Sequence, residues 1–313
     1  MSKSLGTGLN PLDLVELYGA DATRYSLLAQ AGAVQDVRFD ADIADNKVQA
    51  SASAEAGRNF GNKLWNATRF VLLNIEGYET GEHEVEELAD RWIWSRLQAT
   101  VRDVSDQLES YRFSEMTRSV YGFVWRDYCD WYLELAKVRL QGGDADNRKV
   151  AQDNLVRVLE TALRLLHPVM PFITETLWQA LPHRETERSV MVAEWPDLDA
   201  ALADPEAEAQ MARLQEIVTA VRVIRSEMNV PTAKKIELLI SASSPGVAEG
   251  LQQVKPYLVI LCRAESVEID QALAQPPASG SAVATDVEIF VPLEGLINLD
   301  AERKRLEKEI GKF

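Results

Sequence analysis

The sequence predicts a mainly α-helical protein that carries a small α+β module toward its C-terminal end. Apolar residues recur three or four positions apart over most of the first 180 residues, which is the period of an amphipathic helix. From residue 235 onward, short apolar runs alternate with one helical stretch. With 313 residues, of which 46% are hydrophobic and 26% charged, the chain is long enough for two or three domains.

The first 31 residues predict a loop followed by two short helices. Asn10 is a typical N-cap, and Pro11 suits the first helical position because its fixed φ is already helical. A break falls at Tyr18 and Gly19, and residues 32–44 form a connector. We treat residues 1–45 as one segment.

Residues 46–205 predict an up-and-down helical bundle, since several amphipathic helices are joined by short loops. The expected helices cover residues 46–74, 89–110, 114–140, 147–166 and 171–181. Phe60, Leu64, Ala67 and Val71 give the first of them a single apolar stripe. Residues 188–195 are expected to form an extended tail on the bundle.

Residues 206–292 predict the small α+β module. Its expected parts are helices 206–228 and 247–262, strands 235–240, 266–270 and 287–291, and a flexible hairpin loop at 276–281. Residues 293–313 carry a heptad-like series, which predicts the start of a coiled-coil arm. A C-terminal amphipathic helix docked on its own domain is the alternative.

Composition limits the function classes. The net charge of −16 argues against a nonspecific nucleic-acid binder, although residues 45–74 and 301–313 are locally basic. No apolar run approaches the roughly 20 residues of a membrane helix. Two cysteines, Cys129 and Cys262, are expected to be buried free thiols, which fits a cytoplasmic protein without membrane contact. No metal site is expected, because the three histidines lack ligand spacing.

Two segments contain residues suited to phosphate chemistry. At the start, Lys3 offers a charge, and Ser2 and Ser4 offer hydroxyl donors, on a loop with Gly6 and Gly8. In the first bundle helix, phosphates and bases could be bound by Arg58, Asn62, Lys63, Asn66 and Arg69. The alternative is a solvated amphipathic helix with Trp65 and Phe70 in the core.

The order of these motifs resembles class I aminoacyl-tRNA synthetases. Met1-Ser2-Lys3-Ser4-Leu5-Gly6 with Tyr18-Gly19-Ala20-Asp21 is similar to their signature loop and the helix after it. Five further segments resemble the valine/isoleucine/leucine branch of this class. They are Arg58-Asn59-Phe60, Asn62-Lys63-Leu64-Trp65-Asn66, Asp127-Tyr128-Cys129-Asp130-Trp131-Tyr132, His167-Pro168-Val169-Met170-Pro171-Phe172 and Ile224-Arg225-Ser226-Glu227-Met228-Asn229-Val230-Pro231. Within this branch, the valyl-tRNA synthetase family is most similar, through Gln35-Asp36-Val37-Arg38-Phe39 and Pro292-Leu293-Glu294-Gly295.

The resemblance implies an anticodon-binding bundle inside a ligase that activates valine with ATP, with Mg²⁺, and transfers it to tRNA(Val). It implies that Lys3, supported by Ser2 and Ser4, stabilises the ATP phosphates. The anticodon would be contacted by Arg58, Asn62, Lys63, Asn66 and Phe70, and the tRNA body by Arg303, Lys304 and Arg305.

The resemblance also implies what this chain lacks. It starts inside the signature loop, so the nucleotide-binding fold and editing domain would precede it, and the isolated chain is expected to be an inactive, monomeric part that binds no cofactor. Two alternatives stay open: a freestanding tRNA-binding module, and an acidic helical scaffold for protein partners.

Overall fold

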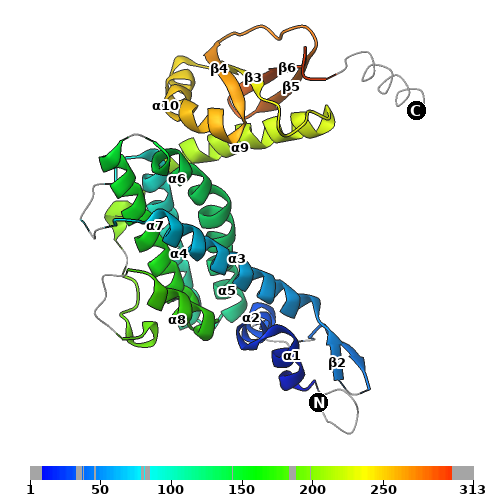
Figure 1. Cartoon of the computed structure of the whole chain (residues 1–313), viewed down its shortest axis with the longest axis vertical. Helices are drawn as coiled ribbons and strands as arrows, with labels where there is room; N and C mark the ends of the chain where they lie inside the picture. The colour runs from blue at the N-terminus through cyan, green and yellow to red at the C-terminus, as the bar shows by residue number, and fades with distance from the viewer. Residues whose placement is uncertain are drawn as a thin grey trace. The chain divides into compact units, whose positions relative to one another are not determined.

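The computed structural model describes residues 9–32, 37, 39–45, 47–78, 81, 85–142, 144–182, 188–197 and 199–297. Figure 1 traces the chain, which forms two compact units, Met1–Pro205 and Glu206–Phe313. Most of the first unit is helical, and the second combines helices with a four-stranded sheet. The mainly α-helical class with a small α+β module is therefore confirmed.

The first unit begins with two short helices and a small hairpin. They are α1 (Pro11–Tyr18), α2 (Ala20–Gln30), β1 (Asp42–Ala44) and β2 (Lys47–Ala50). As predicted, Asn10 caps α1 by accepting a hydrogen bond from Leu12 N, and Pro11 follows it. Gly19 separates α1 from α2 with a φ of 90°, a left-handed conformation that favours glycine.

The remaining helices of this unit form the predicted bundle (Figure 1). They are α3 (Ala52–Asn74), α4 (Leu88–Glu109), α5 (Phe113–Gly122), a π-helix (Phe123–Tyr132), α6 (Leu133–Leu140), α7 (Ala145–Leu166) and α8 (Pro171–Ala180). The stripe Phe60, Leu64, Ala67 and Val71 is buried, as its spacing predicted. The chain from α5 to α6 is one continuous helical stretch, and its π-helical middle was not predicted from the sequence.

The start of α3 corrects one prediction. The helix expected from residue 46 begins at Ala52, because residues 47–50 pair with β1 instead. Val48 packs into a small core with Leu14 and Ala54, and its N–H donates to Asp13 at 3.2 Å. Ser51 is extended and caps α3 by accepting a hydrogen bond from Ala54 N. Contacts with α1 therefore override the helical propensity of this stretch.

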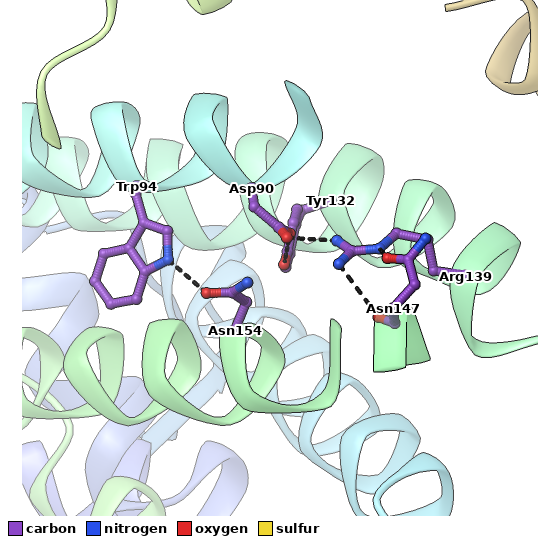
Figure 2. Close-up of polar contacts among 6 residues, drawn as sticks. All are labelled: Asp90, Trp94, Tyr132, Arg139, Asn147 and Asn154. Carbon is purple, nitrogen blue, oxygen red and sulfur yellow. Dashed lines mark hydrogen bonds and ion pairs between the residues drawn. The ribbon is translucent and has the colours of Figure 1, made fainter. Parts of the chain in front are cut away.

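A buried polar network ties three parts of the bundle together (Figure 2). Asp90 on α4 accepts a hydrogen bond of 2.6 Å from the Tyr132 hydroxyl and pairs with Arg139 on α6. Arg139 also donates to the Asn147 carbonyl on α7 at 3.2 Å. Burial raises the pKa of Asp90, and Arg139 and Tyr132 oppose that shift. The network fixes the rotation of α6 and α7 against α4.

The segment after α8 is only partly extended. Val190–Val192 forms a short 3₁₀ helix, and Glu175 on α8 accepts hydrogen bonds from Ser189 and Val190 N. Trp195 donates its indole N–H to the Ser105 hydroxyl on α4 at 2.9 Å. A second 3₁₀ turn follows at Ala200–Leu202.

The second unit is an α+β module. Its elements are α9 (Pro205–Glu227), β3 (Ile236–Ala242), α10 (Pro245–Leu261), β4 (Ala264–Gln271), β5 (Ser279–Ala284) and β6 (Val287–Pro292). The sheet order is β4-β3-β6-β5, with β3 parallel to β4 and antiparallel to β6. Crossover helix α10 joins the two parallel strands, which is the usual way to connect them.

Strand β5 corrects a second prediction. The loop expected at 276–281 ends at Ser279, where β5 starts and pairs antiparallel with β6. Gly280 lies against α9, and a Cβ there would stand 2.5 Å from Ile224 Cγ2. Glycine therefore marks a close approach of strand and helix here, and not a flexible loop. The coiled-coil arm was predicted for residues 293–313; residues 294–296 form a turn, and residues 298–313 lie outside the described residues.

Candidate nucleic-acid interface

Helix α3 presents the residues that the sequence singled out in this unit. Arg58, Asn62 and Asn66 are exposed, whereas Lys63 and Phe70 are half-buried. The buried stripe of α3 faces the core, so the polar residues of the helix lie on its other sides. These five side chains do not form one site. They divide between two cavities on different sides of the helix.

The first cavity has a volume of about 210 Å³ and lies between α3, the π-helix and α6. Its wall includes three of the predicted residues, Lys63, Asn66 and Phe70. The other lining residues are Ala67, Cys129, Leu133, Glu134 and Lys137. An aromatic ring, an amide and two ammonium groups therefore share one small concave space.

Each lysine at this cavity lies over an aromatic ring. The Lys63 ammonium is 4.5 Å from the centre of the Trp125 ring and pairs with Asp130. The Lys137 ammonium is 5.5 Å from the centre of the Phe70 ring and pairs with Glu134 on α6 at 2.5 Å. The rings and carboxylates hold both cations at the rim, where a phosphate could compete for them.

Cys129 contributes a buried free thiol to the wall of this cavity. Burial raises the pKa of its thiol to about 12, while Lys63 acts in the opposite direction. Because the thiolate is the reactive form, this shift lowers the reactivity of the Cys129 thiol at neutral pH.

The second cavity, of about 370 Å³, includes the other two predicted residues, Arg58 and Asn62. Its remaining lining residues are Tyr18, Gly19, Ala20, Asp21, Ala22, Gly57, Gly61, Met170, Phe172 and Ile173. The Arg58 guanidinium lies 5.2 Å from the centre of the Tyr18 ring and 3.1 Å from the Glu55 carboxylate. Phe172 is 64% exposed.

Asp21 in this second cavity is already engaged. Its carboxylate accepts hydrogen bonds from Phe172 N at 3.1 Å and from Ile173 N at 2.7 Å. It thereby satisfies the first N–H groups of α8 and ties that helix to α2. Asp21 positions the cavity wall, and its charge is compensated there.

Sequence reasoning missed the exposed position of Trp65 and two cavity-lining residues, Lys137 and Phe172. Trp65 is 50% exposed, which contradicts its place in the core under the amphipathic-helix alternative. Its position on the polar side of α3, away from the stripe, was a readable signal. Lys137 and Phe172 come from other helices, so no local pattern could link them to α3.

Several predicted residues lie outside the described residues. These are Ser2, Lys3, Ser4, Arg303, Lys304 and Arg305. In the described part of the chain, no group of three or more His, Cys, Asp or Glu side chains could hold a metal ion. The same residues include no helix long and apolar enough to cross a membrane. Cys129 and Cys262 are free and buried, as predicted.

Comparison with known proteins decides the family. A family model for the anticodon-binding domain of tRNA ligase matches residues 90–240. The valine–tRNA ligase of Geobacillus kaustophilus (strain HTA426) is 42% identical over 316 residues, covering 100% of this chain and 34% of that protein. The valine–tRNA ligase of Bacillus anthracis is 43% identical over 314 residues, covering 98% of this chain and 34% of that protein.

The chain belongs to the valine–tRNA ligase family. It spans about a third of the length of the curated relatives it matches and corresponds to their C-terminal part. The resemblance to class I synthetases is thereby confirmed, and so is its valine branch. Among solved structures, an Agrobacterium radiobacter K84 LeuRS in a ternary complex with tRNA and LeuAMS has a TM-score of 0.48 at 24% identity, covering 65% of this chain and 23% of that one.

Proposed function

We propose that this chain is the tRNA-recognition part of a valine–tRNA ligase and binds tRNA(Val) by its anticodon. The observation that carries the proposal is the cavity of about 210 Å³ at Phe70, on a bundle whose residues 90–240 match the anticodon-binding domain of tRNA ligase. We assign recognition to the bundle of residues 46–205, with residues 206–292 as a separate module. The identity of 42% over the whole chain favours this function over a freestanding module or a protein scaffold.

The chemistry of the cavity supports a nucleobase as its occupant. Phe70 offers a ring on which a base can stack, and the Asn66 amide can both donate to and accept from a base edge. Lys63 and Lys137 supply charge for the neighbouring phosphates. Arg58 and Asn62, at the second cavity, would contact a different nucleotide of the same loop.

We further propose that the full-length enzyme activates valine with ATP and Mg²⁺ and esterifies tRNA(Val). The resemblance assigns Lys3, with Ser2 and Ser4, to the ATP phosphates, and Arg303, Lys304 and Arg305 to the tRNA body. The chain alone is proposed to be a catalytically inactive monomer. Measurable ATP–pyrophosphate exchange with valine by the pure chain would contradict that inactivity.

Binding to tRNA(Val) tests the recognition role. The whole chain is titrated with tRNA(Val) and with the same tRNA carrying a replaced anticodon, at matched salt. We expect preference for the native anticodon. Because stacking on an aromatic ring contributes about 1–3 kcal/mol per base, Phe70→Leu should weaken native binding by roughly 5- to 150-fold and reduce the preference for the native anticodon.

The controls separate binding from folding. Phe70→Leu keeps an apolar side chain at this half-buried position, and its thermal unfolding is compared with that of the wild type. Arg102→Gln removes an exposed cation of α4 and should leave the anticodon preference unchanged. Equal affinity of the wild type for both tRNAs would overturn anticodon recognition and favour the scaffold alternative.

A further inference from the structure

One edge of the sheet in the second unit carries a group of cationic residues, which we call the basic edge. Its members are Arg222, Arg225, Lys234, Lys235 and Arg263. Strands β3 and β4 are parallel and start side by side there, with Ile236 paired to Ala264. The loop before β3 and the turn before β4 therefore meet at the same edge, which brings these residues together from three segments of the chain.

Four cations of the basic edge, Arg225, Lys234, Lys235 and Arg263, have contacts that differ from those of most other cations in this acidic chain. Arg58, Arg91, Arg96, Arg139, Arg157 and Arg213 each pair with a carboxylate. Among the described residues, the hydrogen bonds of Arg225, Lys234 and Arg263 all end on backbone carbonyls. The exposed Lys235 side chain has no hydrogen-bond or ion-pair partner within that part of the chain.

Backbone carbonyls hold this positive charge in place. Arg225 donates to the Pro231 carbonyl at 2.9 Å and to the Lys234 carbonyl at 2.7 Å. Arg263 donates to the Thr232 carbonyl at 2.9 Å, and Arg225 reaches the same oxygen at 3.4 Å. Two guanidinium groups therefore share one acceptor, although like charges repel. Burial and the nearby Arg263 lower the pKa of Arg225.

The backbone at Arg263 turns the chain out of α10. Arg263 has a φ of 51°, in the left-handed region that a residue after a helix usually enters as glycine or asparagine. Asn229, after α9, has the same φ of 51° and is one of the residues favoured there. Tyr111, after α4, has a φ of 56°, so this conformation accompanies the end of a helix, and at Arg263 it leads the chain from α10 into β4.

The helix dipoles at the basic edge do not cancel its excess of positive charge. Residues 222–235 and 262–265 contain five Lys or Arg and two Glu, in a chain whose net charge is −16. Helices α9 and α10 both end at this edge, and each C-terminus contributes about half a negative charge. Glu294 precedes Gly295, whose carbonyl accepts a hydrogen bond from Lys234, so a positive excess of about one charge is left after the three carboxylates and both dipoles are counted. It would attract a strongly anionic partner.

We propose that the basic edge binds the phosphate backbone of the tRNA, as a second contact outside the bundle that reads no base sequence. The inference rests on the proposed tRNA-recognition function, which supplies an RNA partner. An acidic protein segment could use the same charges. The RNA is favoured because exposed Lys and Arg donors fixed by backbone contacts are typical of phosphate binding, and because this chain's relatives are tRNA ligases.

The test compares Lys235→Gln/Arg263→Gln with the wild type, using tRNA(Val) and its anticodon-replaced form over a range of salt concentrations. Losing two phosphate contacts should weaken binding to both tRNAs about tenfold and lower the slope of log affinity against log salt by roughly 1–2. The anticodon preference should stay constant. The matched control is Arg102→Gln/Lys149→Gln, which removes the same charges from exposed positions of α4 and α7.

The single variant Lys235→Gln controls for misfolding of the double variant, because the Lys235 side chain makes no hydrogen bond among the described residues. It should produce part of the loss with unchanged thermal unfolding. If the wild type prefers the native anticodon but the double variant keeps its affinity and salt slope, the basic-edge proposal is wrong and the recognition function stands. A variant that loses affinity for poly-glutamate but not for tRNA marks a protein-docking surface and overturns the RNA proposal. No binding of the wild type to either tRNA overturns both.

Discussion

Tyr132 on the π-helix donates a hydrogen bond of 2.6 Å to Asp90 on α4, and both side chains are fully buried. Arg139 supplies the compensating charge from one helix further along. A carboxylate in this position is stable only because both partners are present. The bundle that presents the α3 face therefore depends on polar contacts inside its core.

We predict that Asp90→Ala lowers the free energy of unfolding by roughly 3–5 kcal/mol, because it leaves Arg139 buried without its counterion. Urea denaturation measures the change. Glu55→Ala, which removes the exposed pair with Arg58, should cost no more than about 1 kcal/mol. The double variant Asp90→Leu/Arg139→Met should recover much of the loss. A double variant as unstable as Asp90→Ala would show that the charge is not the cause.

Gly57→Ala should destabilise the first unit, although alanine favours helices. A Cβ at Gly57 would lie 2.7 Å from the Ala22 carbonyl oxygen and 3.1 Å from Ala22 Cα, so α2 and α3 would have to separate. Overpacking of this kind costs about 1–3 kcal/mol. In the second unit, Gly250 faces open space, and Gly250→Ala should gain roughly 0.5–1 kcal/mol. Thermal unfolding of both variants checks the contrast.

We predict that the chain loses stability in mild acid because of the environment of His167. Its Nδ1 lies 2.8 Å from the Thr174 hydroxyl, which itself donates to the Met170 carbonyl at 2.8 Å, so Nδ1 carries the proton. The Nε2 atom is buried and has no hydrogen-bond partner among the described residues. Burial lowers the pKa of His167 below its usual 6.5, while Glu175 and Asp21 act against that shift.

The sign of the effect follows from proton uptake. Below pH 6.5 the unfolded chain binds a proton at this position that the folded chain does not, so stability present above pH 6.5 is lost as pH falls through the folded pKa. Unfolding free energies measured from pH 7 to 5 should fall less steeply in His167→Gln. An NMR titration midpoint for His167 above 6.5 would contradict the argument.

The two cysteines should resist alkylation while the chain is folded. Burial raises the pKa of both Cys129 and Cys262 to about 12, so at pH 8 only about one thiol in ten thousand is ionised. Iodoacetamide should react much faster after denaturation, and mass spectrometry follows both sites. Because the unfolded thiols ionise first, stability should also fall as pH rises from about 9 toward 12. Equal labelling rates in the folded and unfolded chain would exclude this environment.

The sequence by itself determined the helices of the bundle and the family. The spacing of Phe60, Leu64, Ala67 and Val71 set the buried face of α3, and Asn10 with Pro11 fixed the start of α1, because these signals lie within one turn or one stripe. The motifs that resemble class I synthetases identified the family for the same reason: each is a contiguous run of residues.

Only the tertiary structure decided where several segments lie. Residues 47–50 form a strand because Val48 packs against Leu14, and 279–284 form a strand because β6 offers a free edge. Tertiary structure also divided the five predicted α3 residues between two cavities and added Lys137 and Phe172 from other helices. These features depend on contacts between residues far apart in sequence, and a local sequence pattern does not predict such contacts.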